Sequence, residues 1–283
     1  MATSPGYGER CVLRGLINRE TEKGESCSPG PGRLSPVAAL VCRHDHDRFQ
    51  TALFAAAGRR EALFALYAFN YEIARVRETV SEPALGQIRL QWWRESIAAA
   101  FEGGPVRRHI VAGPLTAAIR AHGLTRAHFD RLIDAREGDL DETPLASLAA
   151  LGEYAEATSA RLVFLALETL GVRDPTAEEA GFHVGIAYAL AGLLRAMPYR
   201  ARIAPAVVPA EIAAAALRHL ASARALRASI ARSALPALLP AIVAERWLKR
   251  LARGGFDPFD SALTARDPLQ SWRLAIASLR NRY

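Results

Sequence analysis

The chain has 283 residues, of which 51% are hydrophobic and 23% are charged. This is the composition of an ordinary folded protein, and it excludes a chain that is disordered along its whole length. There are 36 basic and 29 acidic residues, which gives a net charge of +7. That charge permits contact with an anionic surface, but the arginines are spread along helical segments beside carboxylates, as on solvated helix faces. No nucleic-acid-binding motif occurs, so we expect no nucleic-acid partner.

The first part of the chain is rich in Gly, Pro, Ser and charged residues and shows no periodicity. We therefore assign residues 1–44 to a disordered N-terminal segment and residues 45–283 to one domain. Cys11, Cys27 and Cys42 form neither a disulfide framework nor a zinc-ligand pattern. The sequence shows no spanning segment and no signal peptide, which predicts the bacterial cytoplasm or the mitochondrial matrix, with peripheral contact at the inner membrane open.

From residue 47 onward the apolar residues recur at helical spacing, and the alternation typical of strands is absent. This pattern predicts a single all-α domain. Glycine and proline residues mark several of the helix ends. The predicted helices span residues 47–57, 60–80, 82–102, 112–122, 125–139, 147–171, 175–197, 209–233, 235–252 and 267–281.

The predicted helix 60–80 carries an unusual number of polar side chains near its end. Within three turns it contains Asn70, Glu72, Arg75, Arg77 and Glu78. Glu72 and Glu78 are six residues apart and do not share a helical face. We therefore expect them to pair with Arg75 at the surface or at the rim of a cavity.

The predicted helix 175–197 has small residues along one face. Gly185, Ala189 and Gly192 are three or four residues apart, so they lie on the same side of the helix. Such a face lets either a neighbouring backbone or a ligand approach closely, and the residues alone favour tight helix packing.

In these two segments the chain resembles the squalene and phytoene synthase family, whose members are single all-α domains with a central cavity. The resemblance covers residues 45–283. It includes Trp93 and Arg94, at the place of the family's Trp-Arg segment, and Tyr154, which follows the match to the family's aspartate-bearing helix at residues 132–140. The resemblance implies an isoprenoid-synthase fold.

The family's active members place aspartates three or four residues apart on two facing helices, where they hold Mg²⁺ against a substrate diphosphate. This chain has other residues at those positions: Ala74, Arg75, Glu78, Ala196 and Arg200. Five carboxylates (−5) thus become one glutamate and two arginines (−1 and +2, hence +1). We therefore assign no catalytic residue, no metal ligand and no cofactor, and we expect metal-assisted ionisation of an allylic diphosphate to fail.

A closer resemblance is to a non-catalytic branch of this family, typified by complex I assembly factor 6. Its most specific feature is Leu-Arg-Ala-x-Pro-Tyr in place of the second aspartate motif, here at residues 194–199. Further matching runs are residues 69–74, 81–82, 91–94, 153–158 and 256–259. The resemblance implies a protein that assists assembly of respiratory complex I (NADH dehydrogenase), with complex I subunits or assembly intermediates as partners.

Two other functions remain open. An active prenyl transferase of the squalene/phytoene synthase type would act on isoprenoid diphosphates with Mg²⁺, but the carboxylate count at the two motif helices argues against it. The third possibility is a lipid-binding protein without an assembly role.

The candidate site consists of the degenerate motif positions and their neighbours: Asn70, Ala74, Arg75, Glu78, Trp93, Arg94, Arg195, Ala196, Tyr199 and Arg200. Arg195 and Arg200 suit a hydrophobic or anionic lipid ligand, because arginines beside an apolar helix bind anionic head groups. A buried ion pair between Arg195 and Glu78 is the alternative. We also predict an open cavity between the helices that contain Phe69 and Arg195.

Overall fold

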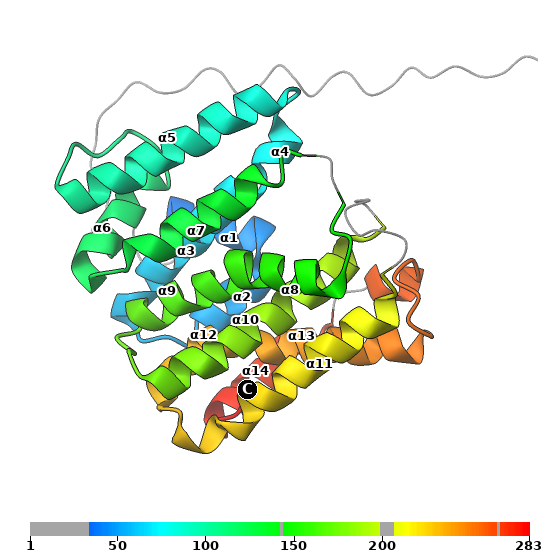
Figure 1. The fold of residues 1–283 in the computed structure, drawn as a ribbon. Coiled ribbons are helices and arrows are strands. Elements are labelled where there is room, and N and C mark those ends of the chain that lie inside the picture. Colours follow the sequence, from blue (N-terminus) through cyan, green and yellow to red (C-terminus); the bar gives the residue numbers. More distant parts are fainter. Residues whose placement is uncertain (1–33, 142–143, 199–206, 265–266) are drawn as a thin grey trace, which may run out of the picture. The chain divides into compact units, whose positions relative to one another are not determined.

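The computed structural model describes residues 34–141, 144–198, 207–264 and 267–283. The regular elements of these residues are helices, and they include no β-strand, so the predicted all-α class is confirmed (Figure 1). The candidate residues Tyr199 and Arg200 lie outside the described residues, as do residues 1–33 of the segment predicted to be disordered.

The described α-helices are α1 (Pro36–His44), α2 (His46–Ala52), α3 (Ala57–Ala74), α4 (Val76–Thr79), α5 (Pro83–Glu102), α6 (Ala112–His122), α7 (Arg126–Glu137), α8 (Leu148–Ala155), α9 (Arg161–Thr169), α10 (Pro175–Ala196), α11 (Pro209–Ala225), α12 (Leu235–Leu238), α13 (Pro240–Arg253) and α14 (Gln270–Leu279). A π-helical segment, Glu156–Ala160, joins α8 to α9. Short 3₁₀ turns lie at Arg227–Ser229, Arg232–Ala234 and Ser261–Thr264. No helix in the described ranges is long and apolar enough to cross a membrane.

Helix α1 was not predicted, and it lies within residues 1–44, the segment that the sequence pattern assigned to the N-terminal lead-in. The Ser35 side chain accepts a hydrogen bond from the Ala38 amide at 3.1 Å, and Pro36 occupies the first helical position. This Ser-Pro pair is a helix-start signal. The helix buries Val37 and Val41 against α3, so the helical unit already begins at Leu34.

Several predicted helix ends agree with the structure because glycine and proline fix them. Pro83 and Pro175 stand at the starts of α5 and α10, where a missing amide proton costs nothing. Gly103 and Gly123 follow α5 and α6 with positive φ angles of 76° and 57°, a conformation that other residues rarely adopt.

Three predicted helices are interrupted. The helix 60–80 turns at Arg75, which both ends α3 and begins α4. The helix 147–171 contains the π-helical segment, and the helix 235–252 breaks before Pro240, which has no amide proton to donate.

Helix α10 is central to one half of the helical unit and contacts α8, α9, α11 and α13 (Figure 1). Helix α3 has the same role in the other half, where it packs against α1, α6 and α9. The short helix α2 touches both α3 and α13 and so connects the two halves.

The small residues of α10 serve close packing at one position and not at another. A Cβ atom at Gly185 would lie 2.5 Å from the Cα atom and 2.7 Å from the amide nitrogen of Ala160 in the π-helical segment. The prediction of tight packing is therefore confirmed at Gly185. A Cβ atom at Gly192 would meet nothing within 4 Å.

Candidate functional site

The first degenerate motif forms a corner between α3 and α4, which we call the first-motif corner (residues 70–79). Arg75 lies 3.6 Å from the Glu72 carboxylate, so the predicted pairing of these two residues is confirmed. The Arg75 guanidinium also lies 5.3 Å from the centre of the Tyr71 ring. Glu78 is exposed on α4. Ala74, the last residue of α3, has no group that could bind a ligand through a charge.

The first-motif corner borders a small pocket of about 290 Å³. The pocket is lined by Glu72, Arg75, Val76, Arg89, Trp92, Trp93 and His109. Its charged groups are one carboxylate and two guanidinium groups, a set that repels metal cations and offers them a single anionic ligand.

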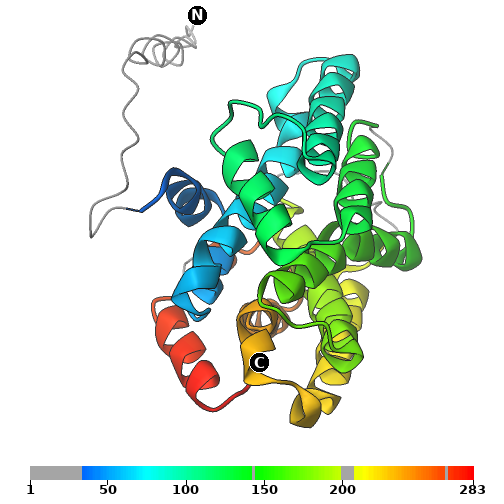
Figure 2. The ribbon, with the colours of Figure 1, turned by 90° about the vertical axis from the view of Figure 1, so that its left-hand side faces the viewer.

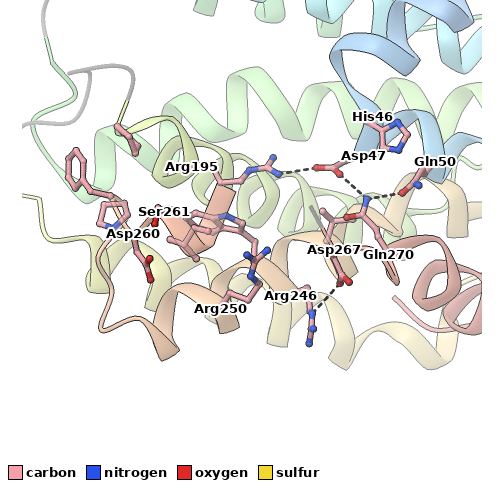
Figure 3. A pocket seen from close by; sticks show the side chains of 16 residues that line it. His46, Asp47, Gln50, Arg195, Arg246, Arg250, Asp260, Ser261, Asp267 and Gln270 are labelled. Carbon is pink, nitrogen blue, oxygen red and sulfur yellow. Dashed lines mark hydrogen bonds and ion pairs between the residues drawn. The ribbon is translucent and has the colours of Figure 1, made fainter. Parts of the chain in front are cut away.

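The second degenerate motif lies at the end of α10 and has a different environment (Figure 3). The Nη1 atom of Arg195 donates to the Oδ2 atom of Asp47 on α2 at 3.0 Å. The predicted ion pair of Arg195 with Glu78 is wrong in its partner, because Asp47 of α2 lies beside Arg195 while Glu78 is exposed on α4. Ala196, which ends α10, is half-buried.

Asp47 also accepts hydrogen bonds from a second residue of α10 and from a residue of α14. The Gln270 side chain donates to its Oδ1 atom at 2.9 Å, and the Tyr188 hydroxyl donates to its Oδ2 atom at 3.4 Å. Burial opposes ionisation of Asp47, but the charge of Arg195 and these hydrogen bonds together hold the pKa of the carboxyl below its ordinary value. Asp47 is therefore an anion at neutral pH, already bound on both oxygen atoms.

A second arginine occupies the space between α3 and α10. Arg48 of α2 is buried, with its guanidinium 4.6 Å from the centre of the Tyr188 ring and 5.8 Å from that of Tyr67. It forms an ion pair with Asp45 at 2.9 Å and donates to the Ser159 hydroxyl at 3.4 Å. Burial raises the pKa of both tyrosines, so both remain neutral at neutral pH. We call Asp45, Asp47, Arg48, Tyr188 and Arg195 the interior network.

A third buried charge pair lies at the end of α7. Asp139 forms an ion pair with Arg136 at 3.0 Å and accepts a hydrogen bond from the Tyr154 hydroxyl at 3.1 Å. Asp139 is 6% exposed and pairs inside the protein, so it is not free to bind a metal ion.

The candidate residues Asn70, Trp93 and Arg94 lie on α3 and α5. Arg94 of α5 forms ion pairs with Asp134 at 2.6 Å and Glu137 at 2.8 Å, which ties α5 to α7. Trp93 is buried and packs edge-on against Phe69, with 5.2 Å between ring centres. The Oδ1 atom of Asn70 is buried and has no hydrogen-bond partner among the described residues.

A larger pocket of about 570 Å³ opens beside Arg195, between α2, α10, α13 and α14 (Figure 3). Its basic side chains are Arg195, Arg246 and Arg250, and its acidic ones are Asp47, Asp260 and Asp267. Its apolar side chains include Val243, Trp247, Phe259 and Leu263. The pocket thus joins an apolar wall to a set of arginines and carboxylates in equal number. The two degenerate motifs line different pockets.

A model of the squalene/phytoene synthase family matches residues 41–215, which is more than half of the chain. The chain belongs to the squalene/phytoene synthase family. Among its relatives is NADH dehydrogenase (ubiquinone) complex I, assembly factor 6, of Bos taurus, which is 30% identical over 99% of this chain and 95% of the bovine protein. Presqualene diphosphate synthase of Rhodopseudomonas palustris is 29% identical over 54% of each chain.

The fold is also that of the family. The crystal structure of squalene synthase HpnC from Alicyclobacillus acidocaldarius superposes with a TM-score of 0.68 at 19% identity. The match covers 79% of this chain and 94% of that one. The predicted isoprenoid-synthase fold is therefore confirmed.

Sequence reasoning missed Asp45, Asp47 and Arg48 of this squalene/phytoene synthase family member. Asp47 and Arg48 fall at the start of the predicted helix 47–57, and none of the three was predicted as a site residue, although they pair with or surround Arg195. The signal was available, since five charged or titratable residues precede buried Phe49 in the run His44-Asp-His-Asp-Arg48. A charged residue next to the apolar face of a helix is seldom buried unless it is paired.

Proposed function

We propose that this chain assists assembly of NADH dehydrogenase, respiratory complex I, and does not carry out metal-dependent prenyl transfer. The observation that carries the proposal is the ion pair of Arg195 with Asp47 at the second motif, which leaves this end of α10 without a free carboxylate. Ala196 beside it and Ala74 at the first motif cannot bind a cation. The match to assembly factor 6 over nearly the whole chain supports the assembly role.

The electrostatics of the interior network support the absence of metal chemistry. Arg48 and Arg195 both approach the Tyr188 ring, at 4.6 and 5.8 Å, and each forms an ion pair with a carboxylate, Asp45 or Asp47. The carboxylates beside the motif are therefore already neutralised by arginines. Within the described ranges, no three His, Cys, Asp or Glu side chains are grouped so that they could hold a metal ion.

The partners under this proposal are complex I subunits or assembly intermediates. The chain then works in the bacterial cytoplasm or the mitochondrial matrix, at the membrane where NADH dehydrogenase is assembled. The pocket beside Arg195 suits a ligand with an apolar body and an anionic head group, since arginines and apolar side chains such as Val243 and Trp247 both line it.

Deletion of the gene, followed by complementation, tests the proposal. Fully assembled NADH dehydrogenase is measured in membranes on native gels, and squalene and phytoene are measured in the same cells. We expect the deletion to reduce the assembled enzyme and to leave both isoprenoids unchanged. Normal assembly together with loss of either isoprenoid would show that the chain is a prenyl transferase, the function that the similarity to presqualene diphosphate synthase favours.

Variants of the second motif sharpen the test. Arg195→Ala removes the partner of Asp47, whereas Arg218→Ala removes an arginine that is exposed on α11. At equal protein abundance, we expect Arg195→Ala to restore less assembled enzyme than Arg218→Ala. Equal rescue by both variants would exclude the second motif from the assembly mechanism.

The purified protein should not convert farnesyl diphosphate with Mg²⁺, and turnover at roughly 1 per second would contradict the proposal.

A further inference from the structure

The outer face of α14 carries a row of exposed apolar side chains. Leu269, Trp272, Ile276 and Leu279 are three or four residues apart, so they lie on one side of the helix. Trp272 is 70% exposed and Leu279 is 75% exposed. The opposite side of α14 buries Leu274 and Ala277 in the core. We call the four exposed residues the α14 stripe.

Exposed apolar side chains are more frequent on α14 than on the rest of the described residues. The described residues expose thirteen large hydrophobic side chains, and four of them fall in the eleven residues of the α14 stripe. Figure 2 shows α14, in red, at the edge of the helical unit with no other helix over its outer side. Contiguous exposed apolar patches on folded proteins mark surfaces that bind a partner or a membrane.

The charges around the α14 stripe are predominantly positive. Arg280 and Arg282 follow the helix, are exposed, and have no carboxylate partner among the described residues. Arg232 reaches the carbonyl oxygen of Ser278 at 3.5 Å, which adds a third cation at this end. At the other end, the carboxylate of Asp267 is bound by both Arg246 and Arg273, each at 3.2 Å. Unpaired positive charge therefore borders the stripe.

We propose that the α14 stripe docks this protein on an anionic lipid bilayer surface. An interfacial helix buries its apolar face at the boundary between head groups and acyl chains, and its arginines interact with anionic lipids. A tryptophan suits this boundary because its ring is apolar and its indole N–H is polar. The proposal does not depend on the assembly role or on the pocket beside Arg195.

A second copy of the chain fits the α14 stripe less well. A stable interface between two proteins buries roughly 800 Å² on each partner with about 20 to 30 residues. Helix α14 has 10 residues, fewer than such an interface needs on each partner. A lipid surface requires no such area and neutralises the arginines.

The test measures sedimentation of the full chain with vesicles of phosphatidylcholine alone and of phosphatidylcholine mixed with phosphatidylglycerol. We expect binding to the anionic vesicles and weaker binding to the neutral ones. Trp272→Ser combined with Leu279→Ser should lower binding about tenfold or more. The matched control is Leu85→Ser with Ile88→Ser, which changes two exposed apolar residues on α5 and should bind like the unmodified chain.

Arg280→Gln with Arg282→Gln should lower binding to anionic vesicles by roughly tenfold and leave binding to neutral vesicles unchanged. The exposed pair Arg131→Gln with Arg218→Gln is the control for total charge. Tryptophan emission should shift to the blue on binding, and Trp272→Phe should abolish the shift but retain binding, since Trp93 and Trp247 are buried and Trp92 is half-buried on α5. Circular dichroism confirms that each variant folds.

Three results would overturn the proposal. The first is no binding of the unmodified chain to anionic vesicles, and the second is equal binding by the Trp272 and Leu279 double variant. The third is a dimer in sedimentation velocity that this double variant dissociates, without vesicle binding, which would assign the stripe to a second copy.

Discussion

The resemblance places the first-motif corner and the end of α10 at the family's two aspartate motifs, and the arginines at these two places differ in their contacts. Arg75 is 37% exposed at its side chain and approaches one carboxylate at 3.6 Å. Arg195 joins α10 to α2 at 3.0 Å, and its partner Asp47 is also bound by Tyr188 and Gln270. Both arginine side chains are about one-third exposed, 37% for Arg75 and 36% for Arg195, so the difference lies in their contacts: Arg75 approaches a carboxylate of its own helix, whereas Arg195 joins two helices.

The largest difference should follow from removing the buried arginine of the interior network. Arg48→Ala leaves the Asp45 carboxylate without its partner, and breaking a buried pair on one side costs about 3 to 5 kcal/mol in the free energy of unfolding. Arg75→Ala is the control in the first-motif corner and should change the free energy of unfolding by less than about 1 kcal/mol. Chemical denaturation of both variants measures the two values. Similar losses would contradict the distinction between interior and surface.

The two glycines of α10 provide a smaller, matched test. Gly185→Ala should destabilise the protein by about 1 to 3 kcal/mol, because its methyl group would meet the backbone of Ala160 and force the helices apart. Gly192→Ala meets open space and should be neutral or stabilising by up to about 1 kcal/mol, since alanine favours helix more than glycine does. Thermal unfolding of the two variants measures both changes in stability. A neutral Gly185→Ala would show that α10 does not pack tightly there.

The smallest expected effect concerns the pH dependence of Asp47. Its pKa is lowered in the folded state, so its ionised form contributes stability above its ordinary value of 3.8, and this contribution is lost as the pH falls through the folded value. Asp47→Asn should therefore cost about 1 to 2 kcal/mol at pH 7 and progressively less below the ordinary value. Unfolding curves between neutral and acidic pH measure the difference.

Glu72→Gln is the matched control for Asp47→Asn, because Glu72 pairs with Arg75, a partly exposed arginine at the first-motif corner. We expect a change of less than about 1 kcal/mol in the free energy of unfolding. A cost for Asp47→Asn that is the same at every pH would show that shape, and not charge, accounts for the role of Asp47.

The fold class and most helices could be predicted because they depend on local signals. The start of α10 is marked by Asp174, which accepts a hydrogen bond from the Ala177 amide at 2.8 Å, followed by Pro175. No such local signal predicts the π-helical break between α8 and α9. The π-helical segment lies where the Ala160 backbone meets Gly185, a contact made by a helix that follows later in the chain.

The sequence by itself determined that this chain is all-α and that it resembles the squalene/phytoene synthases, with Ala74, Arg75 and Ala196 at positions that the resemblance matches to the family's aspartate motifs, because residue identity and helical spacing are local properties. Only the tertiary structure decided the partner of Arg195, which is 148 residues away, and the outward orientation of the α14 stripe. Both depend on how each helix is rotated and packed against the others. Helical periodicity indicates that a helix has faces, but long-range packing determines which face is buried.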